Sequence, residues 1–262
     1  MKAHVYSVDG NPVEEIELPK QFEEEVKEEL IRRAVLAEQS RKYQPKGVFK
    51  LAGMQTSAEY RGRKEAYGSI KNRGISRLPR EKFPKGRFGK VRIVPFSVKG
   101  RRAHPPKPEK VLVERINKKE HQKALRSAIA ATARKELVAA RGHRVDGVKE
   151  IPLVVEDRFE ELSKTKEVVG CLKALGVEKE LERARGKKAS GVKGRRRGGS
   201  VRAKSLLVVV GNGSKVARAA RNIAGVDVKS VSELDVSSLA PGSQAGRLTL
   251  WSRRALEELR KV

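Results

Sequence analysis

The stretch LLVVVGNGSKVARAARN, residues 206–222, decides the fold class of this chain. Its first five residues form a continuous apolar run, which is typical of a strand buried on both faces of a parallel sheet. A turn at residues 211–214 then leads into a predicted helix that ends near Asn222. Strands that alternate with helices in this way are typical of α/β folds.

Further strands and helices are predicted on both sides of this stretch. Apolar patterns predict an N-terminal hairpin over residues 1–18, then strands at 151–155, 226–228 and 248–251. Helical patterns cover residues 21–40, 118–140, 163–175, 177–184 and the end of the chain from Ser252. The sequence therefore predicts an α/β protein: a three-layer α/β/α globular domain with a mainly parallel sheet, plus a long extended basic loop.

The glycines after the 206–210 strand suggest a nucleotide site, because glycines and helix N-termini bind phosphates. The pattern fails in detail: a dinucleotide fingerprint needs Gly or Ala where this chain has Val216, and no Gly-Lys-Ser/Thr occurs anywhere. The four histidines lie in different segments, Cys171 lies in an apolar pattern, and no spacing typical of a nucleophile and its base is present. We therefore expect no enzymatic activity, no catalytic residue, no metal site and no cofactor.

The charge of the chain points to a polyanionic partner. Sixty Lys and Arg residues face 32 Asp and Glu, for a formal net charge of +28, and nucleic acid is the leading candidate. No apolar run approaches the roughly 18 residues of a membrane-spanning helix, and the start MKAHVYSVDG lacks the apolar region of a signal peptide. We therefore expect a cytoplasmic protein with no membrane partner and no small-molecule substrate.

Residues 41–107 fit no sustained helix or strand pattern. They hold 20 Lys and Arg, three acidic residues and seven of the eleven aromatic residues. Structureless segments of this length are functional or disordered. Cations interleaved with aromatic residues and glycines suit folded RNA, whose splayed bases stack on aromatic rings, better than a DNA duplex. We expect this segment to be mobile in isolation and to fold on its RNA.

A second basic segment, residues 183–204, repeats this chemistry with ten Lys and Arg, five Gly and no acidic residue. Glycines at this density let the backbone approach phosphates closely. Arg126 is a further candidate on the helix predicted at 118–140. The residues of the second basic segment that we expect to bind RNA are Arg183, Arg185, Lys187, Lys188, Lys193, Arg195, Arg196 and Arg197.

Several short stretches resemble a known family. They are RGISRLPR (73–80), VKGRRAHPPK (98–107), RSAIAAT (126–132), RGH (141–143), APG (240–242) and GRL (246–248). Together they are similar to the universal fourth protein of the large ribosomal subunit. The chain stops soon after its last predicted helix, which favours the archaeal type of that family.

The resemblance implies a structural constituent of the large ribosomal subunit that binds and organises large-subunit rRNA. Its extended loop would reach the wall of the nascent-peptide exit tunnel, and its partners would be rRNA and neighbouring large-subunit ribosomal proteins. Residues 1–40 and 108–262 would form the globular domain, and residues 41–107 the rRNA-penetrating loop inserted in it. The alternatives are an RNA-modifying or RNA-cleaving α/β enzyme with a basic substrate-binding arm, and a chromatin-type DNA binder.

The resemblance also locates site residues in the extended loop. By match, the tip near the exit tunnel would be Arg73, Gly74, Ser76 and Arg77. A basic piece at 81–95, longer than in the family pattern, makes Lys85, Arg87 and Phe88 competing candidates. The residues of the loop expected to bind rRNA are Lys50, Tyr60, Arg61, Arg63, Lys64, Tyr67, Lys71, Arg80, Lys99, Arg101, Arg102, His104 and Lys107.

Overall fold

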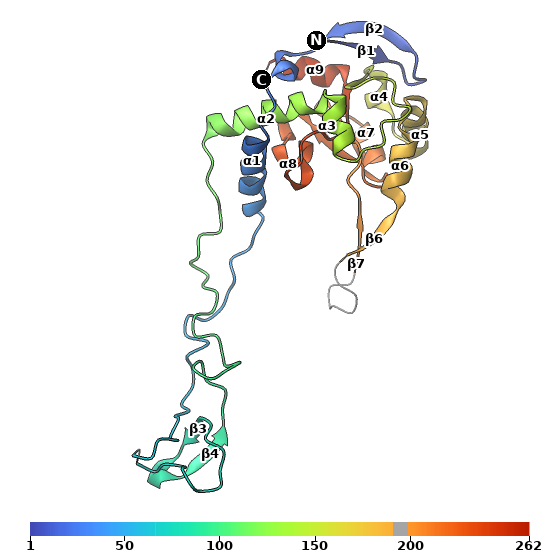
Figure 1. Cartoon of the computed structure of the whole chain (residues 1–262). Helices are drawn as coiled ribbons and strands as arrows, with labels where there is room; N and C mark the ends of the chain where they lie inside the picture. Colours follow the sequence, from blue (N-terminus) through green and yellow to red (C-terminus); the bar gives the residue numbers. More distant parts are fainter. Residues whose placement is uncertain (66, 191–198, 262) are drawn as a thin grey trace. The chain divides into compact units, whose positions relative to one another are not determined.

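The computed structural model describes residues 1–65, 67–190 and 199–261 (Figure 1). The chain divides into two compact units. The larger unit combines Met1–Lys42 with Val113–Val262, and the smaller unit is Tyr43–Leu112. No helix in the described ranges is both long and apolar enough to cross a bilayer.

A six-stranded sheet forms the centre of the larger unit, in the order β2-β1-β5-β10-β8-β9. Strand β2 pairs antiparallel with β1, and every other neighbouring pair is parallel. The predicted α/β class with a mainly parallel sheet is therefore confirmed. The strands are β1 (Lys2–Tyr6), β2 (Pro12–Glu17), β5 (Leu153–Val155), β8 (Leu207–Val210), β9 (Asp227–Ser230) and β10 (Thr249–Ser252).

Successive side chains of the central strands enter two separate hydrophobic cores. On β8, Leu207 and Val209 belong to one core, and Val208 and Val210 to the other. The alternation follows from the two-residue period of a strand. Because both faces of β8 are covered, this stretch must be apolar at every position. The run LLVVV therefore predicts a buried strand from sequence alone. The sheet lies between two helical layers, as the three-layer prediction required.

Four α-helices pack on the first face of the sheet. Phe22, in the short helix η1 (Lys20–Glu23), contacts Trp251 of β10 edge to face, with ring centroids 5.3 Å apart. Both side chains are buried, so this aromatic pair anchors the N-terminal segment to the sheet. The helices are α1 (Glu28–Ser40), α2 (Lys118–Thr132), α8 (Val236–Leu239) and α9 (Arg253–Leu259), with η3 (Val231–Glu233) and η4 (Pro241–Ser243) beside them.

The opposite face carries the second helical layer. Gly176 ends α5 at a φ of +82°, and a Cβ there would meet the carbonyl oxygen of Gly147 at 1.8 Å, so only glycine fits. Cys171 is buried in this layer, and burial raises the pKa of its thiol to about 12, as expected for an unreactive core cysteine. The helices are α3 (Lys135–Ala140), α4 (Arg158–Glu161), α5 (Thr165–Ala174), α6 (Glu178–Arg185) and α7 (Val216–Arg221).

Two helices predicted as continuous are broken. The helix predicted at 21–40 is divided into η1 and α1, because the Ser127 hydroxyl accepts the Lys27 N–H at 2.7 Å and donates to the Glu25 carbonyl at 3.1 Å. The helix predicted at 118–140 is divided at Arg134. The break lets α2 pack in the first core while Val138 of α3 enters the second, which one straight helix could not do.

The smaller unit holds little regular structure in its described residues. A hairpin pairs β3 (Arg80–Lys82) with β4 (Phe88–Val91) through the turn η2 (Pro84–Gly86). Ile70 and Val94 are buried, at 2% and 0% exposure. The hairpin was not predicted, because strands of three and four residues are too short to show a period.

A second hairpin extends from the end of α6 in the larger unit. It pairs β6 (Lys187–Ser190) with β7 (Gly199–Arg202), where the sequence predicted a loop at 183–204. These strands contact no third strand among the described residues, so they carry no core-facing apolar pattern for sequence reasoning to detect.

Candidate RNA interface

Most cations and tyrosines predicted to bind rRNA from the smaller unit are exposed. Tyr67 shows 85% of its surface to solvent, and Phe49, Phe83 and Phe96 are also exposed. Aromatic rings left in water beside cations are typical of a surface that stacks on nucleotides. The predicted residues that are exposed are Lys50, Tyr60, Arg63, Lys64, Tyr67, Lys99, Arg101, Arg102, His104 and Lys107.

Three predicted residues, Arg61, Lys71 and Arg80, are half-buried. The Arg61 guanidinium donates to the Glu59 carboxylate at 3.1 Å, and this hydrogen bond lowers the pKa of Glu59. Arg80 donates to the Ser76 hydroxyl at 2.8 Å. Both hydrogen bonds join residues close in sequence, so Arg61 and Arg80 also order the backbone beside them.

The two stretches that compete for the tip contact each other. The guanidinium carbon of Arg73 lies 5.6 Å from the centre of the Phe88 ring, a cation–π contact. Gly74 has a φ of +65° in an open turn. Arg73, Gly74, Ser76 and Arg77 are all exposed. Arg73 and Phe88, one residue from each stretch, thus lie side by side in the smaller unit.

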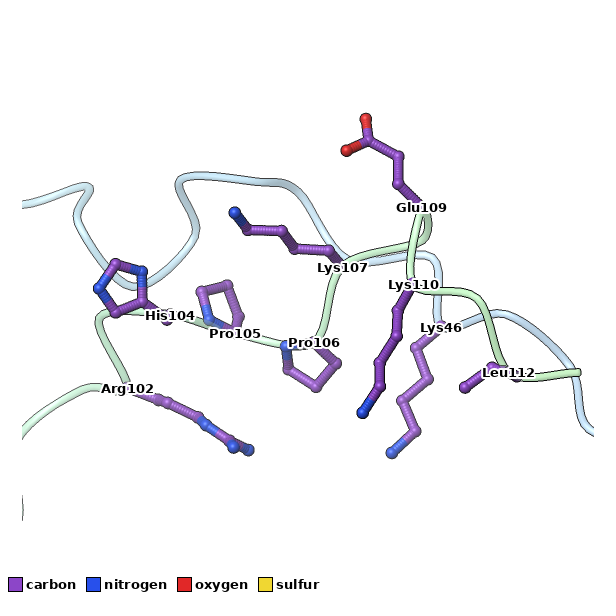
Figure 2. Close-up of a pocket in the computed structure, with 9 residues that line it drawn as sticks. All are labelled: Lys46, Arg102, His104, Pro105, Pro106, Lys107, Glu109, Lys110 and Leu112. Atoms are coloured by element: carbon purple, nitrogen blue, oxygen red, sulfur yellow. The ribbon is translucent and has the colours of Figure 1, made fainter. Parts of the chain in front are cut away.

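A pocket of about 570 Å³ lies between two extended segments of the smaller unit, one at Lys46 and the other at residues 102–112. Figure 2 shows the charged ends of Lys46, Arg102 and Lys110 on the same side of the ribbon. The outgoing and returning segments come into close contact at Gly53, where a Cβ would lie 1.6 Å from the Arg102 carbonyl oxygen. Sequence reasoning predicted Arg102 but missed Lys46 and Lys110, because no local pattern shows which parts of two extended strands lie together.

The predicted residues of the larger unit are only partly described. Arg126 on α2 and Arg185 at the end of α6 are exposed, and Arg183 is half-buried. The side chains of Lys187 and Lys188 lie outside the described residues, as do Lys193, Arg195, Arg196 and Arg197 entirely.

A buried polar cluster lies at the start of the β6–β7 hairpin. Glu180 accepts hydrogen bonds from Arg183 at 2.6 and 2.8 Å and from the Arg144 N–H at 3.0 Å, and it lies 2.7 Å from His143 Nδ1. Burial alone would raise the pKa of Glu180, but the bonds from Arg183, His143 and Arg144 outweigh it and hold the pKa at about 2. The carboxylate is therefore charged and fixes the direction of Arg183.

Arg247, whose side chain is buried, joins segments that are distant in sequence. It donates to the carbonyls of Ser205 at 2.7 Å and Ser238 at 2.8 Å, and pairs with Asp227 at 2.7 Å. Sequence reasoning did not place Arg247 or the Glu180 cluster among functional residues. The stretches RGH (141–143) and GRL (246–248) contributed to the family resemblance. They did not indicate that the two segments lie close together in the fold.

The sequence of this chain matches known ribosomal proteins over nearly its whole length. The model of the ribosomal protein L4/L1 family matches residues 16–262. "Large ribosomal subunit protein uL4" of Methanococcus maripaludis strain C6 is 47% identical over 261 residues, 99% of this chain and 98% of the relative. The proteins of the same name from Methanococcus vannielii and Methanocaldococcus jannaschii are 47% and 46% identical over 263 residues, 100% of this chain and 99% of each relative. The chain belongs to the ribosomal protein L4/L1 family.

Proposed function

We propose that this chain is a structural, rRNA-binding constituent of the large ribosomal subunit in the cytoplasm. Its relatives carry the name of a large-subunit protein over nearly their full length. The observation that carries the proposal is the smaller unit, Tyr43–Leu112, whose cations and aromatic side chains are exposed while few apolar residues are buried. Such a surface gains most of its contacts from a polyanion.

The polar groups at the carboxyl ends of the central strands support a structural role over an enzymatic one. An enzyme of this fold would bind substrate at that edge. Here the Glu160 carboxylate, which is buried, accepts the Ser252 hydroxyl at 2.5 Å and the Gly211 N–H at 2.7 Å. Asp157 accepts the Arg254 N–H at 3.0 Å. These groups hold α4, the β8 turn and α9 together, so they are engaged within the fold.

We further propose that residues 41–107 form the loop that penetrates rRNA, inserted in a globular domain of residues 1–40 and 108–262. The exposed Arg73, Gly74, Ser76 and Arg77 would then approach the exit tunnel, with Phe88 beside them. Neighbouring large-subunit proteins would complete the set of partners. A photo-crosslinking residue at position 77 should capture a stalled nascent chain, whereas one at exposed position 126 should not. Equal capture from both positions would refute the tip assignment.

The proposal is tested by salt-resistant association. The chain should sediment with large ribosomal subunits after a high-salt wash, and its affinity for rRNA should fall with salt at about −0.7 to −0.9 in the log–log slope per neutralised phosphate. Deleting residues 51–101 should reduce this slope sharply while the larger unit keeps its unfolding transition. Equal affinity for duplex DNA and rRNA at the same salt, or turnover of an RNA substrate, would favour one of the alternatives.

A further inference from the structure

A small cationic pocket of about 340 Å³ opens on the larger unit beside the β6–β7 hairpin. Arg141 follows α3, Arg183 lies on α6, and Lys204 lies between β7 and β8. His143 also lines the pocket. Lys204 belongs to the second basic segment, whereas Arg141 was not predicted as an RNA contact. The segments that supply these residues are distant in sequence.

The charges around this pocket do not cancel. Four cations, Arg141, Arg183, Lys204 and Arg247, share two carboxylates. Glu180 binds Arg183, and Asp227 binds both Lys204, at 2.9 Å, and Arg247, at 2.7 Å. The remaining cation, Arg141, has no carboxylate partner among the described residues. The pocket therefore carries an excess of positive charge, centred on Arg141.

Arg141 is held in place by backbone carbonyls. Its guanidinium donates to the Pro241 carbonyl at 2.7 Å and to the Gln244 carbonyl. A guanidinium has five N–H donors, so three of them have no protein acceptor within the described ranges. Burial, together with repulsion from Arg247 and Arg183, lowers the pKa of Arg141 to about 10. The group still carries its charge at neutral pH, and a bound anion would relieve both the repulsion and the unfilled donors.

A second observation concerns His143. Its side chain is 1% exposed, and its Nδ1 is taken by Glu180. The other ring nitrogen, Nε2, is buried without a hydrogen-bond partner in the described part of the chain. Buried polar atoms are nearly always satisfied by protein, water or ligand. His143 thus leaves one buried polar atom beside the pocket without a protein partner in the described ranges, while the free N–H donors come from Arg141.

The neighbouring surface indicates what kind of anion fits. A larger hollow of about 800 Å³ shares Lys204, Pro241 and Gly242 with this pocket and is also lined by Arg218 and Arg221 of α7. Lys42, Lys229 and Arg247 also line this larger hollow, together with three acidic residues, Asp227, Glu233 and Asp235. Cations therefore outnumber carboxylates six to three and continue from one hollow into the next. A strand with a negative charge on every unit would meet them in succession, whereas a single small anion would fill only the first.

We propose that the pocket formed by Arg141, His143, Arg183 and Lys204 binds a backbone phosphate of large-subunit rRNA, with Arg141 as its principal ligand. This inference rests on the proposed function and adds a contact site on the larger unit. A guanidinium fixed by two carbonyls presents its free N–H groups in a rigid fork, which matches the geometry of a phosphate. The strand would then pass Lys204 towards α7.

The test compares Arg141→Gln with a matched control, Arg144→Gln, in the full chain. Arg144 lies three positions away, is exposed and does not line the pocket, so the control removes the same charge from the same region. The probe is deproteinised large-subunit rRNA in filter binding over a range of salt, with phosphate ethylation interference on the same RNA. Fluorescence of the single buried tryptophan, Trp251, verifies that each variant is folded.

We expect Arg141→Gln to lower the affinity about tenfold, to reduce the log–log salt slope by about 0.7 to 0.9, and to abolish interference at one phosphate position. Arg144→Gln should retain the full interference pattern. A purely structural role for Arg141 would weaken binding without removing interference at a single position. If Arg141→Gln does not fold, Lys204→Gln must lose interference at the same phosphate or at its neighbour.

The outcomes separate this inference from the proposed function. If the unaltered chain shows no preference for rRNA, the proposed function fails. If it binds rRNA but Arg141→Gln and Arg144→Gln are indistinguishable in slope and interference, the pocket does not bind rRNA phosphate and the inference is overturned. That second result would also be obtained if an acidic protein segment occupied the pocket.

Discussion

The charge on Glu180 should make the stability of the larger unit depend on pH between 6 and 3. The perturbation is Glu180→Gln, which keeps the shape of the side chain and removes its charge. The carboxylate side chain is fully buried and bonded to Arg183, His143 and the Arg144 N–H. Replacing it leaves the half-buried Arg183 without its anionic partner, and removing the fully buried member of an ion pair typically costs about 3–5 kcal/mol.

The magnitude can also be obtained from the pKa of Glu180. The pKa falls from 4.5 for an ordinary glutamate to about 2 in the folded chain. At about 1.4 kcal/mol for each unit of pKa difference, the ionised carboxylate stabilises the fold by about 3 kcal/mol at neutral pH. The folded pKa is the lower one, so this stabilisation is complete above pH 4.5 and is lost as the pH falls towards 2. About 2 kcal/mol should be lost between pH 6 and pH 3.

Urea unfolding followed by Trp251 fluorescence measures this effect. Trp251 is the single tryptophan and is fully buried in the first core, and urea leaves ionic interactions unscreened. The free energy of unfolding of the unaltered chain should exceed that of Glu180→Gln by about 3 kcal/mol at pH 6, and this difference should shrink by about 2 kcal/mol at pH 3. A difference that is the same at both pH values would refute the reasoning, because it would show that the charge contributes nothing.

Other substitutions test the packing around the site. Gly176→Ala should lower the free energy of unfolding by at least about 2 kcal/mol, because its Cβ would overlap a carbonyl oxygen and the φ of this residue is positive. The control, Gly170→Ala, lies in open space on α5 and should be neutral or stabilising by up to about 1 kcal/mol. Urea unfolding compares the two variants. Arg247→Met should cost about 3 kcal/mol or more, because three segments lose the donor that they share. As a control, Arg253→Met, at an exposed position of α9, should change the melting temperature little. Glu38→Gln should cost about 1–2 kcal/mol in thermal unfolding, because its carboxylate accepts two N–H groups at the start of α8; no loss would show that these bonds are dispensable.

Several elements follow from local sequence alone. The apolar run at 206–210 predicted β8, and the glycine at 176 predicted the end of α5. The two broken helices were not predictable in the same way. Their breaks depend on Ser127, about 100 residues from the segment it interrupts, and on the need for Ile129 and Val138 to enter different cores. Helical periodicity is continuous across both breaks, so tertiary contacts override it.

The sequence by itself determined the α/β class, the basic segment at 41–107 and the preference for a polyanionic partner, because the period of apolar residues and the net charge are read directly from the order and composition of the chain. Only the tertiary structure decided which cations are neutralised. Glu180 meets His143 across 37 positions, and Asp227 meets Arg247 across 20, so Arg141 is left without an acidic partner among the described residues. Electrostatic energy depends on distance in space. Those distances are fixed by the packing of helices on a sheet, and they cannot be obtained from the composition of the chain.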